Sequence, residues 1–419
     1  METINGKTLQ LFIEKVSGLA NRRCGRGFAN KMRSLRTERE RLLKNNWRKI
    51  PPEALVLSEE QEIFRVIDFD TIVLNAAGYL KEKEYVELLF DVAEVSISFS
   101  QMERAQRLLH MVVTKLKKFS TNLLLARAHQ RLGDISFYRN NWVTTLRHYT
   151  KSLDLFTKLK NSKGIAHLKS SIGSTLVVSQ GGIIKGEKHL KEAKAIAKKA
   201  RLNELLQKIN TNLGNVYAMR GIWDEAMTCY KEALSLIGRK RDDAERAKLY
   251  INIAIIYKAR GEYEKALEHF QKSIKLAASA NDQYSKGLSY LEEAELYCRM
   301  GDLAAGTALA TTAFRIFSGL GDRLSVAEVY KIFGIINREN KRFDTALSYL
   351  ENSKRITEDY DDPLNLGETM MEMAKLYGMK GGEIAKAKES AKSAISCFKR
   401  INADVRVSQA KELLAAYSA

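Results

Sequence analysis

Few residues in this sequence have the types and spacing that catalysis or metal binding needs. Residues 181–188 read GGIIKGEK, which has the glycines of a phosphate-binding loop, but Glu187 stands where such a loop carries Lys. No predicted strand precedes this segment either. The six His residues show no HxxxH or HExxH spacing, so we expect them in packing or at the surface. We therefore predict that the protein is not an enzyme and uses no metal or other cofactor.

The spacing of the Cys residues and the lack of long apolar runs indicate where in the cell the protein resides. Cys24, Cys229, Cys298 and Cys397 are too far apart for a CxxC motif, which is typical of reduced thiols in a reducing compartment. Residues 1–30 contain no apolar run followed by a small-residue cleavage site. No stretch reaches the roughly 18 apolar residues of a membrane span. These features predict a soluble, cytoplasmic protein.

Positive charge is concentrated near the N-terminus. The formal net charge is +19, and residues 22–49 hold 11 Arg or Lys against two Glu, which is nearly half of the excess. One interpretation is a solubilising arm. The other is a basic amphipathic helix that binds phosphate backbones, an anionic membrane surface or an acidic protein. The candidate contact residues for that interpretation are Arg33, Arg36, Arg39 and Arg41.

Small residues recur with a period of 40 along most of the chain. Counting forward from Gly214 in steps of 40 reaches four further positions, and counting backward in one step of 41 and then steps of 40 reaches three more. All eight positions, with Gly214 included, are Gly or Ala: Ala93, Gly133, Gly173, Gly214, Ala254, Ala294, Gly334 and Ala374. Gly and Ala are only 68 of the 419 residues, so composition does not explain the agreement. Two further phased sets follow twelve or thirteen residues later and then seven residues later, with Val112 as the one larger member.

Each period predicts two helices joined by a tight turn. One apolar stripe with helical spacing ends near Tyr217, and a second begins at Ala226. Gly221, Gly261 and Gly301 fall between such stripes, where a residue in the left-handed conformation closes a helix. A single helix pair does not bury its own apolar face, so the pairs are expected to stack as a solenoid.

This layout resembles the tetratricopeptide repeat family. The matching residues in one period are Leu213, Gly214, Tyr217, Gly221, Ala226, Tyr230 and Ala233. The resemblance covers about residues 87–400 and is most specific at 207–274. The period of 40 exceeds the common family period of about 34, and no Pro closes the second helix. The chain therefore looks more like the long-helix branch that includes kinesin light chains, the Asn-Leu-Gly-Asn adaptors and many bacterial regulators.

The resemblance implies an all-α fold, a right-handed superhelical α-solenoid of about eight antiparallel helix pairs. We expect a basic N-terminal arm at 1–50, partly helical or disordered, and a helical cap or half-repeat at 51–86. Eight repeats follow at 87–401, and a capping helix ends the chain at 402–419. The acidic segment EDYDDP at 358–363 is expected to be a loop between repeats.

The resemblance also implies where a ligand would bind. In the family, the sixth and ninth positions of the first helix contact peptides on the concave side, and here these are Asn212, Asn215 and, in the next repeat, Asn252. An Asn side chain both donates and accepts hydrogen bonds, so it can pair with a peptide backbone of any sequence. The alternative interpretation is that these side chains only cap or bridge neighbouring helices.

Basic residues beside these positions bear on the charge of the partner. Lys258, Arg299 and Arg338 would give the middle of the groove a positive rim, which favours an acidic partner, unless they are simply solvated charges. Our leading prediction is a non-enzymatic scaffold or adaptor that binds a peptide or partner protein in the concave groove. The alternative is a regulator that contacts nucleic acid through residues 22–49 while the repeats bind a partner.

Overall fold

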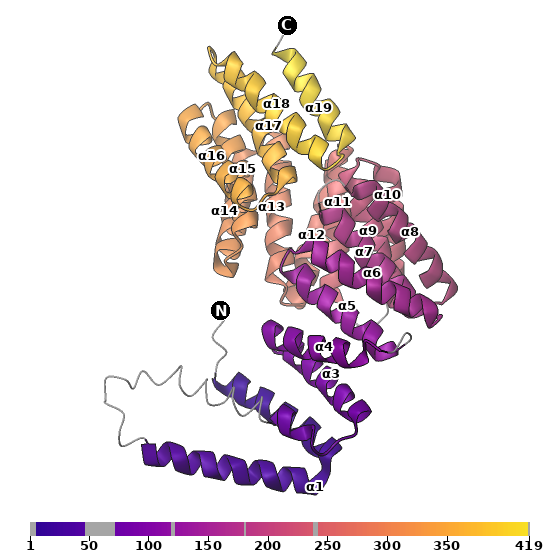
Figure 1. The fold of residues 1–419 in the computed structure, drawn as a ribbon. Helices are drawn as coiled ribbons and strands as arrows, with labels where there is room; N and C mark the ends of the chain where they lie inside the picture. Colours follow the sequence, from indigo (N-terminus) through magenta and orange to yellow (C-terminus); the bar gives the residue numbers. More distant parts are fainter. Residues whose placement is uncertain (1–5, 47–71, 119–121, 180–181, 238–241, 418–419) are drawn as a thin grey trace. The chain divides into compact units, whose positions relative to one another are not determined.

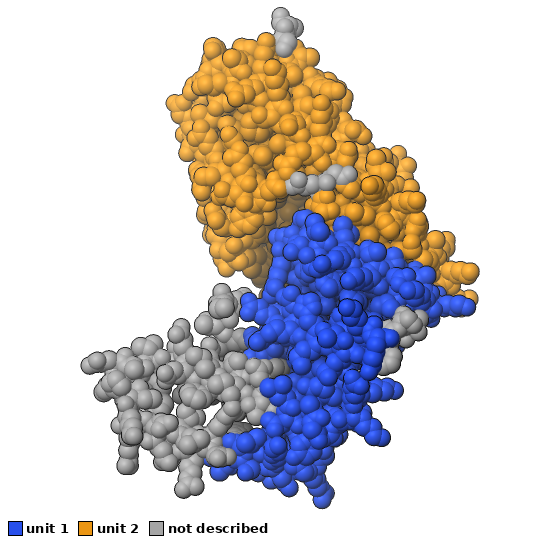
Figure 2. Space-filling model, in the orientation of Figure 1, with its two compact units in different colours: residues 1–168 blue, residues 169–419 orange. Residues whose placement is uncertain are grey.

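The computed structural model describes residues 6–46, 72–118, 122–179, 182–237 and 242–417 (Figure 1). The described part of the chain is helical and contains no strand. It divides into two compact units, Met1–Leu168 and Lys169–Ala419, which Figure 2 shows in different colours. Each unit is described by itself below.

Unit 1 begins with a long helix that packs on the first pair. The helices of this unit are α1 (Gly6–Asn46), α3 (Glu82–Ser98), α4 (Met102–Leu116), α5 (Leu123–Tyr138), α6 (Trp142–Lys158) and the start of α7 (Ser162–Val178). The backbone of α1 leaves the helical conformation at Gly25 (φ 78, ψ −173), so the helix kinks there. Phe12 and Phe28, on either side of the kink, are fully buried. Much of the predicted basic arm is thus helical, whereas most of the predicted cap at 51–86 lies outside the described residues.

Unit 2 continues the same alternation of helices to the end of the chain. After the rest of α7 come α8 (Ile183–Lys199), α9 (Asn203–Met219), α10 (Trp223–Leu236), α11 (Asp243–Ala259), α12 (Tyr263–Ser279), α13 (Gln283–Met300), α14 (Leu303–Leu320), α15 (Arg323–Glu339), α16 (Phe343–Asp359), α17 (Pro363–Lys380), α18 (Ile384–Arg400) and α19 (Asp404–Ala416). Odd-numbered helices from α3 to α17 are the first helices of their pairs, and the even-numbered ones are the second helices. Eight consecutive antiparallel pairs are present in the described chain, which confirms the predicted fold class.

The phased small residues are the points where helices approach each other closely. All three phased sets are buried along their whole length, from Ala93 to Ala394. A Cβ atom added to Gly214 would lie 2.4 Å from the ring of Tyr230, and one added to Gly133 would lie 2.4 Å from Tyr149. A ring on the second helix therefore rests directly on the backbone of the first, so the period observed in the sequence is a packing period.

The turns share one backbone device. Nearly every described turn between helices contains one residue with φ between 50 and 86. Gly221, Gly261 and Gly301 take this conformation, as the sequence indicated, with φ of 73, 76 and 86. The turn at 360–362 uses Asp361 at φ 50, and Asp362 then caps α17 by accepting hydrogen bonds from two backbone N–H groups. The acidic segment at 358–363 therefore makes the turn between α16 and α17.

One described helix, α14, is long and apolar enough to cross a membrane by length and composition, although no such stretch was expected from the sequence. Its buried side, which includes Ala310, Ala313 and Phe317, packs with Leu291 of α13 and Ile332 of α15 in one core cluster. This packing gives the apolar composition of α14 a role within the stack of pairs.

Candidate functional site

Polar side chains on successive first helices meet at a fixed sequence distance. In unit 2, Asn252 Nδ2 donates to Asn215 Oδ1 at 3.2 Å, and Lys258 Nζ donates to Glu295 Oε2 at 2.6 Å, each across 37 residues. The same separation joins Lys331 to Glu368. With a period of 40, a step of 37 reaches the next first helix about one turn earlier, where neighbouring side chains face each other. We call this row of contacts the first-helix ladder.

The asparagine part of the ladder links three helices. Asn212 Nδ2 on α9 donates to Ser174 Oγ on α7 at 2.9 Å. Asn215 Oδ1 accepts from Asn252 on α11 and also from the Tyr230 hydroxyl at 2.8 Å. Bridging between neighbouring helices, which the sequence left as one alternative, is therefore part of what these side chains do.

The ladder continues from α11 to α19 as a network of charges. Its cations are Lys258, Arg299, Lys331, Arg338, Lys375 and Arg406, and their carboxylate partners are Glu292, Glu295, Glu339, Glu368 and Glu372. Glu328 lies close enough to Lys331 to raise the pKa of that amine. Six cations thus lie among six carboxyl groups along this face, and each cation has at least one carboxylate partner.

Burial and pairing oppose each other in the pKa values of this network. Burial alone would raise the pKa of Glu368, but Lys331 and Arg406 outweigh it and hold the value at about 2. Glu295 follows the same pattern, since Lys258 and Arg299 keep its pKa below the ordinary value despite burial. Glu328 has weaker compensation, and burial raises its pKa to about 7. Most of the network is therefore fixed in its charge state at neutral pH.

The structure brings together some of the predicted ligand-binding residues. Asn215 contacts Asn252, and Lys258 and Arg299 share Glu295. Arg338 joins a separate part of the network through Glu372 and Glu339. Each of the three predicted basic residues thus has a carboxylate partner, so they present paired rather than unpaired positive charge.

The predicted basic contact residues lie on α1 in unit 1. Arg33 is exposed. The side chains of Arg36, Arg39 and Arg41 lie outside the described residues. Their proposed role therefore stays a prediction.

Sequence reasoning missed the carboxylates that complete the ladder. Glu292 and Glu295 were not among the predicted site residues. A step of 34 or 37 from Lys258 reaches them, and the same steps pair Arg338 with Glu372 and Lys331 with Glu368. Opposite charges at these offsets were a readable signal once the period was known.

A histidine pair in unit 1 was also missed. The Nδ1 atoms of His129 and His148 lie 3.1 Å apart, and both side chains are buried. Burial, with nearby Lys151 and His110, lowers the pKa of each ring to about 4. The pair is therefore neutral at neutral pH, and one ring donates to the other. In the described part of the chain, no group of three His, Cys, Asp or Glu side chains is placed to hold a metal ion.

Comparison with known families identifies the repeats. A family model described as tetratricopeptide repeat matches residues 205–279, which include the asparagine part of the ladder. The chain contains tetratricopeptide repeats. A search of curated proteins found no relative of similar sequence.

Solved structures of tetratricopeptide repeat type share the fold at low sequence identity. The apo quorum sensor NprR from B. thuringiensis is 13% identical, with a TM-score of 0.60 over 83% of this chain and 96% of that one. The Rap conjugation gene regulator of plasmid pLS20, solved with the Phr* peptide, is 16% identical, with a TM-score of 0.57 over 79% and 93%. Aspartyl phosphate phosphatase F from Bacillus subtilis is 11% identical, with a TM-score of 0.56 over 96% and 97%. At these identities, the similarity establishes the fold alone.

Proposed function

We propose that the protein is a non-enzymatic scaffold that binds a peptide, or an extended segment of another protein, along the first helices of unit 2. The observation that carries this proposal is the first-helix ladder, a row of polar side chains that runs across successive pairs on one set of helices. The second helices carry no comparable row among the described residues. The Rap conjugation gene regulator of plasmid pLS20, which has a similar fold, was solved in complex with the Phr* peptide.

The asparagines retain hydrogen-bonding groups that the ladder does not use. Asn215 accepts two hydrogen bonds through Oδ1, while its Nδ2 donates to no described atom. Asn212 and Asn252 each donate through Nδ2, and their Oδ1 atoms accept from no described atom. These donors and acceptors can pair with a peptide backbone without selecting its side chains.

The charge network bears on the sequence of the partner. Because each of its six cations already has a carboxylate partner, a uniformly acidic peptide would gain little net attraction. A partner with both signs of charge, exchanging with the existing pairs, fits this face better. We therefore propose a partner of mixed charge, in place of the acidic partner that the basic residues alone had suggested.

Peptide selection tests this function directly. Full-length protein would be used to select from a display library of twelve-residue peptides, and the enriched peptides would be titrated by fluorescence anisotropy. We expect Asn212→Ala/Asn215→Ala/Asn252→Ala to weaken binding at least tenfold, about 1.4 kcal/mol. Asn352→Ala is the matched control, because Asn352 lies on second helix α16 and bonds only within that helix. If no peptide is enriched, or if the triple variant binds as well as the control, the proposal is wrong.

A second candidate function is nucleic-acid binding by α1. Arg22, Arg26 and Arg33 are all exposed on this helix, within the most basic stretch of the chain. Arginines on one helix are suited to phosphate backbones without reading a base sequence.

The salt dependence of DNA binding tests this candidate. Affinity for a 20-base-pair duplex would be measured at rising salt for the wild type and for Arg22→Gln/Arg26→Gln/Arg33→Gln. If these side chains contact phosphates, the slope of log affinity against log salt falls by about 0.9 per lost contact. Arg23 is left intact because it ties α1 to α3. Equal slopes for the two proteins would exclude this function for α1.

A further inference from the structure

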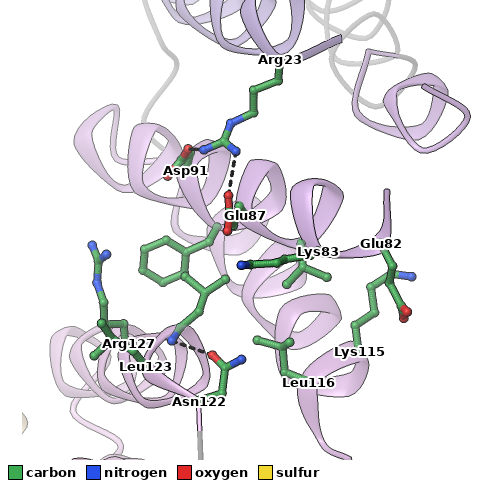
Figure 3. Close-up of a pocket in the computed structure, with 13 residues that line it drawn as sticks. Arg23, Glu82, Lys83, Glu87, Asp91, Lys115, Leu116, Asn122, Leu123 and Arg127 are labelled. Atoms are coloured by element: carbon green, nitrogen blue, oxygen red, sulfur yellow. Dashed lines mark hydrogen bonds and ion pairs between the residues drawn. The ribbon is translucent and has the colours of Figure 1, made fainter. Parts of the chain in front are cut away.

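A cavity of about 690 Å³ lies within unit 1, among α1, α3, α4 and α5 (Figure 3). This volume is in the range of pockets that bind small organic molecules. The cavity lies in the N-terminal unit and shares no lining residue with the first-helix ladder of unit 2. A molecule bound in this cavity would therefore be distinct from the peptide partner proposed for unit 2.

The floor of the cavity is apolar. Val86 and Phe90 of α3 and Leu116 of α4 are buried, and each lines the cavity. Leu123 and Leu124, at the start of α5, form one wall. A molecule in this cavity would therefore place a hydrocarbon or aromatic body against these side chains.

The carboxylates at the cavity are all occupied by other cations. Arg23 reaches from α1 to Glu87 at 3.0 Å and to Asp91 at 2.5 Å, as Figure 3 shows. Glu82 pairs with Lys118, which lies outside the cavity lining, at 3.6 Å. Each acidic residue of the cavity thus has a cation partner other than Lys83, Lys115 and Arg127, although Glu87 and Asp91 share the one positive charge of Arg23.

Three cations around the cavity have no carboxylate partner in the described chain. Lys83 on α3, Lys115 on α4 and Arg127 on α5 come from three different helices and all line the cavity, with Arg127 and Lys115 on opposite sides of Lys83 in Figure 3. Arg127 lies over the ring of Phe90 at 4.6 Å, and Lys115 lies over the ring of Tyr85 at 5.5 Å. Like charges gathered around an apolar hollow repel each other, and an anion bound between them would remove that repulsion.

We propose that this cavity is a binding site for a small organic anion, in which a single carboxylate or sulfonate is joined to an apolar body. The apolar body lies on Val86, Phe90 and Leu116, and the anionic group lies between Lys83, Lys115 and Arg127. Inorganic phosphate would satisfy the cations but would leave the apolar floor without a partner. A neutral hydrocarbon would cover the floor and leave the cations unpaired. Only an amphipathic anion matches both parts of the cavity.

Photolabelling of the full-length protein with 4-benzoylbenzoate tests this site. The probe combines an aromatic body with one carboxylate, and irradiation attaches it to nearby C–H bonds. We expect labelling on peptides that contain Phe90, Leu116 or Leu124, with decanoate as a competitor. Lys83→Gln/Arg127→Gln should weaken labelling at least tenfold, because both changes remove a cation and leave the apolar floor intact. Lys158→Gln, which removes a cation from another surface of unit 1, should label as the wild type does.

Neutral benzophenone and the cationic 4-(aminomethyl)benzophenone complete the experiment on the wild-type protein, so the outcome does not depend on how the variants fold. The proposal requires both to label the cavity at least tenfold more weakly than the carboxylate does. Equal labelling by the three probes, labelling confined to other peptides, or no effect of the double substitution would overturn it. The asparagine variants of unit 2 should label normally, which separates this site from the proposed peptide function.

Discussion

At the scale of single residues, the fold depends on glycines and alanines that bring large side chains against the backbone of the neighbouring helix. Tyr230 is the clearest case, because its ring rests on Gly214 while its hydroxyl donates to Asn215 at 2.8 Å. Tyr149 repeats both contacts in unit 1, with its ring on Gly133 and its hydroxyl bound to Asp134. One aromatic side chain thus joins packing to the polar face of the first helix.

This interlock predicts the effect of adding one methyl group. Gly214→Ala would place a Cβ atom 2.4 Å from the Tyr230 ring, so the ring must move and its bond to Asn215 must weaken. We expect a loss of about 1–3 kcal/mol in the free energy of unfolding, measured in urea. Gly319→Ala is the control, because nothing lies within 4 Å of the added atom and the site is helical. That variant should gain roughly 0.5–1 kcal/mol; similar losses in both would contradict the interlock.

Glu293 predicts a dependence of stability on pH. Burial raises the pKa of this carboxyl group from 4.5 to about 7, so the folded protein holds its proton more tightly than the unfolded chain does. The stability that protonated Glu293 contributes is therefore complete below pH 4.5 and is lost as the pH rises through about 7. At pH 8 the free energy of unfolding of Glu293→Gln, measured in urea, should exceed that of the wild type by about 1–2 kcal/mol. This difference should shrink at pH 5. Because Glu328 titrates in both proteins, only the difference between them reports Glu293; a difference independent of pH would contradict this assignment.

At the scale of elements, the left-handed turn residue sets where each helix ends. Gly261 has φ of 76 and nothing within 4 Å of an added Cβ, so a substitution there meets backbone strain alone. Gly261→Ala should cost about 1–2 kcal/mol in urea unfolding. The equivalent turn one pair before the last uses Lys341 at φ 59, which already carries this strain. Lys341→Gly should therefore leave the free energy of unfolding unchanged or raise it. A large loss of stability would show that contacts of the Lys341 side chain, rather than backbone strain, determine the stability of this turn.

The elements also show how far sequence reasoning reaches. The helix pairs and the turns at Gly221, Gly261 and Gly301 were readable because glycine marks both close packing and left-handed backbone. The left-handed backbone at Lys160, Arg201 and Lys341 could not be predicted, since residues with long side chains rarely adopt this conformation. Here the packing of the surrounding helices holds them in it. The Asn residues of the candidate site were found from a family resemblance, whereas their carboxylate neighbours needed the period combined with the helical turn. The cavity of unit 1 had no sequence signal, because its lining comes from four helices without a common spacing.

At the scale of the whole molecule, a stack of repeats is usually a chain of nearest-neighbour contacts. A contact between described residues of unit 2 departs from this rule. A Cβ atom added to Gly221, in the turn between α9 and α10, would lie 2.6 Å from Val405 of α19. The last helix thus contacts its own neighbours, α17 and α18, and also a turn that is four pairs earlier in the chain.

This long-range contact predicts a specific pattern of hydrogen exchange. Ending the chain at Ala403 removes α19, including Ala410, which is fully buried, and Arg406, which pairs with Glu368 on α17. Amides of α17 and α18 should then exchange faster, and so should those of the α9–α10 turn, while α13 and α14 stay protected. Val405→Ala removes the distant contact and keeps the near ones, so it should accelerate exchange at the α9–α10 turn without affecting α17. If that turn is unchanged in both proteins, unit 2 behaves as a purely linear stack, and the contact at Gly221 contributes nothing to its stability.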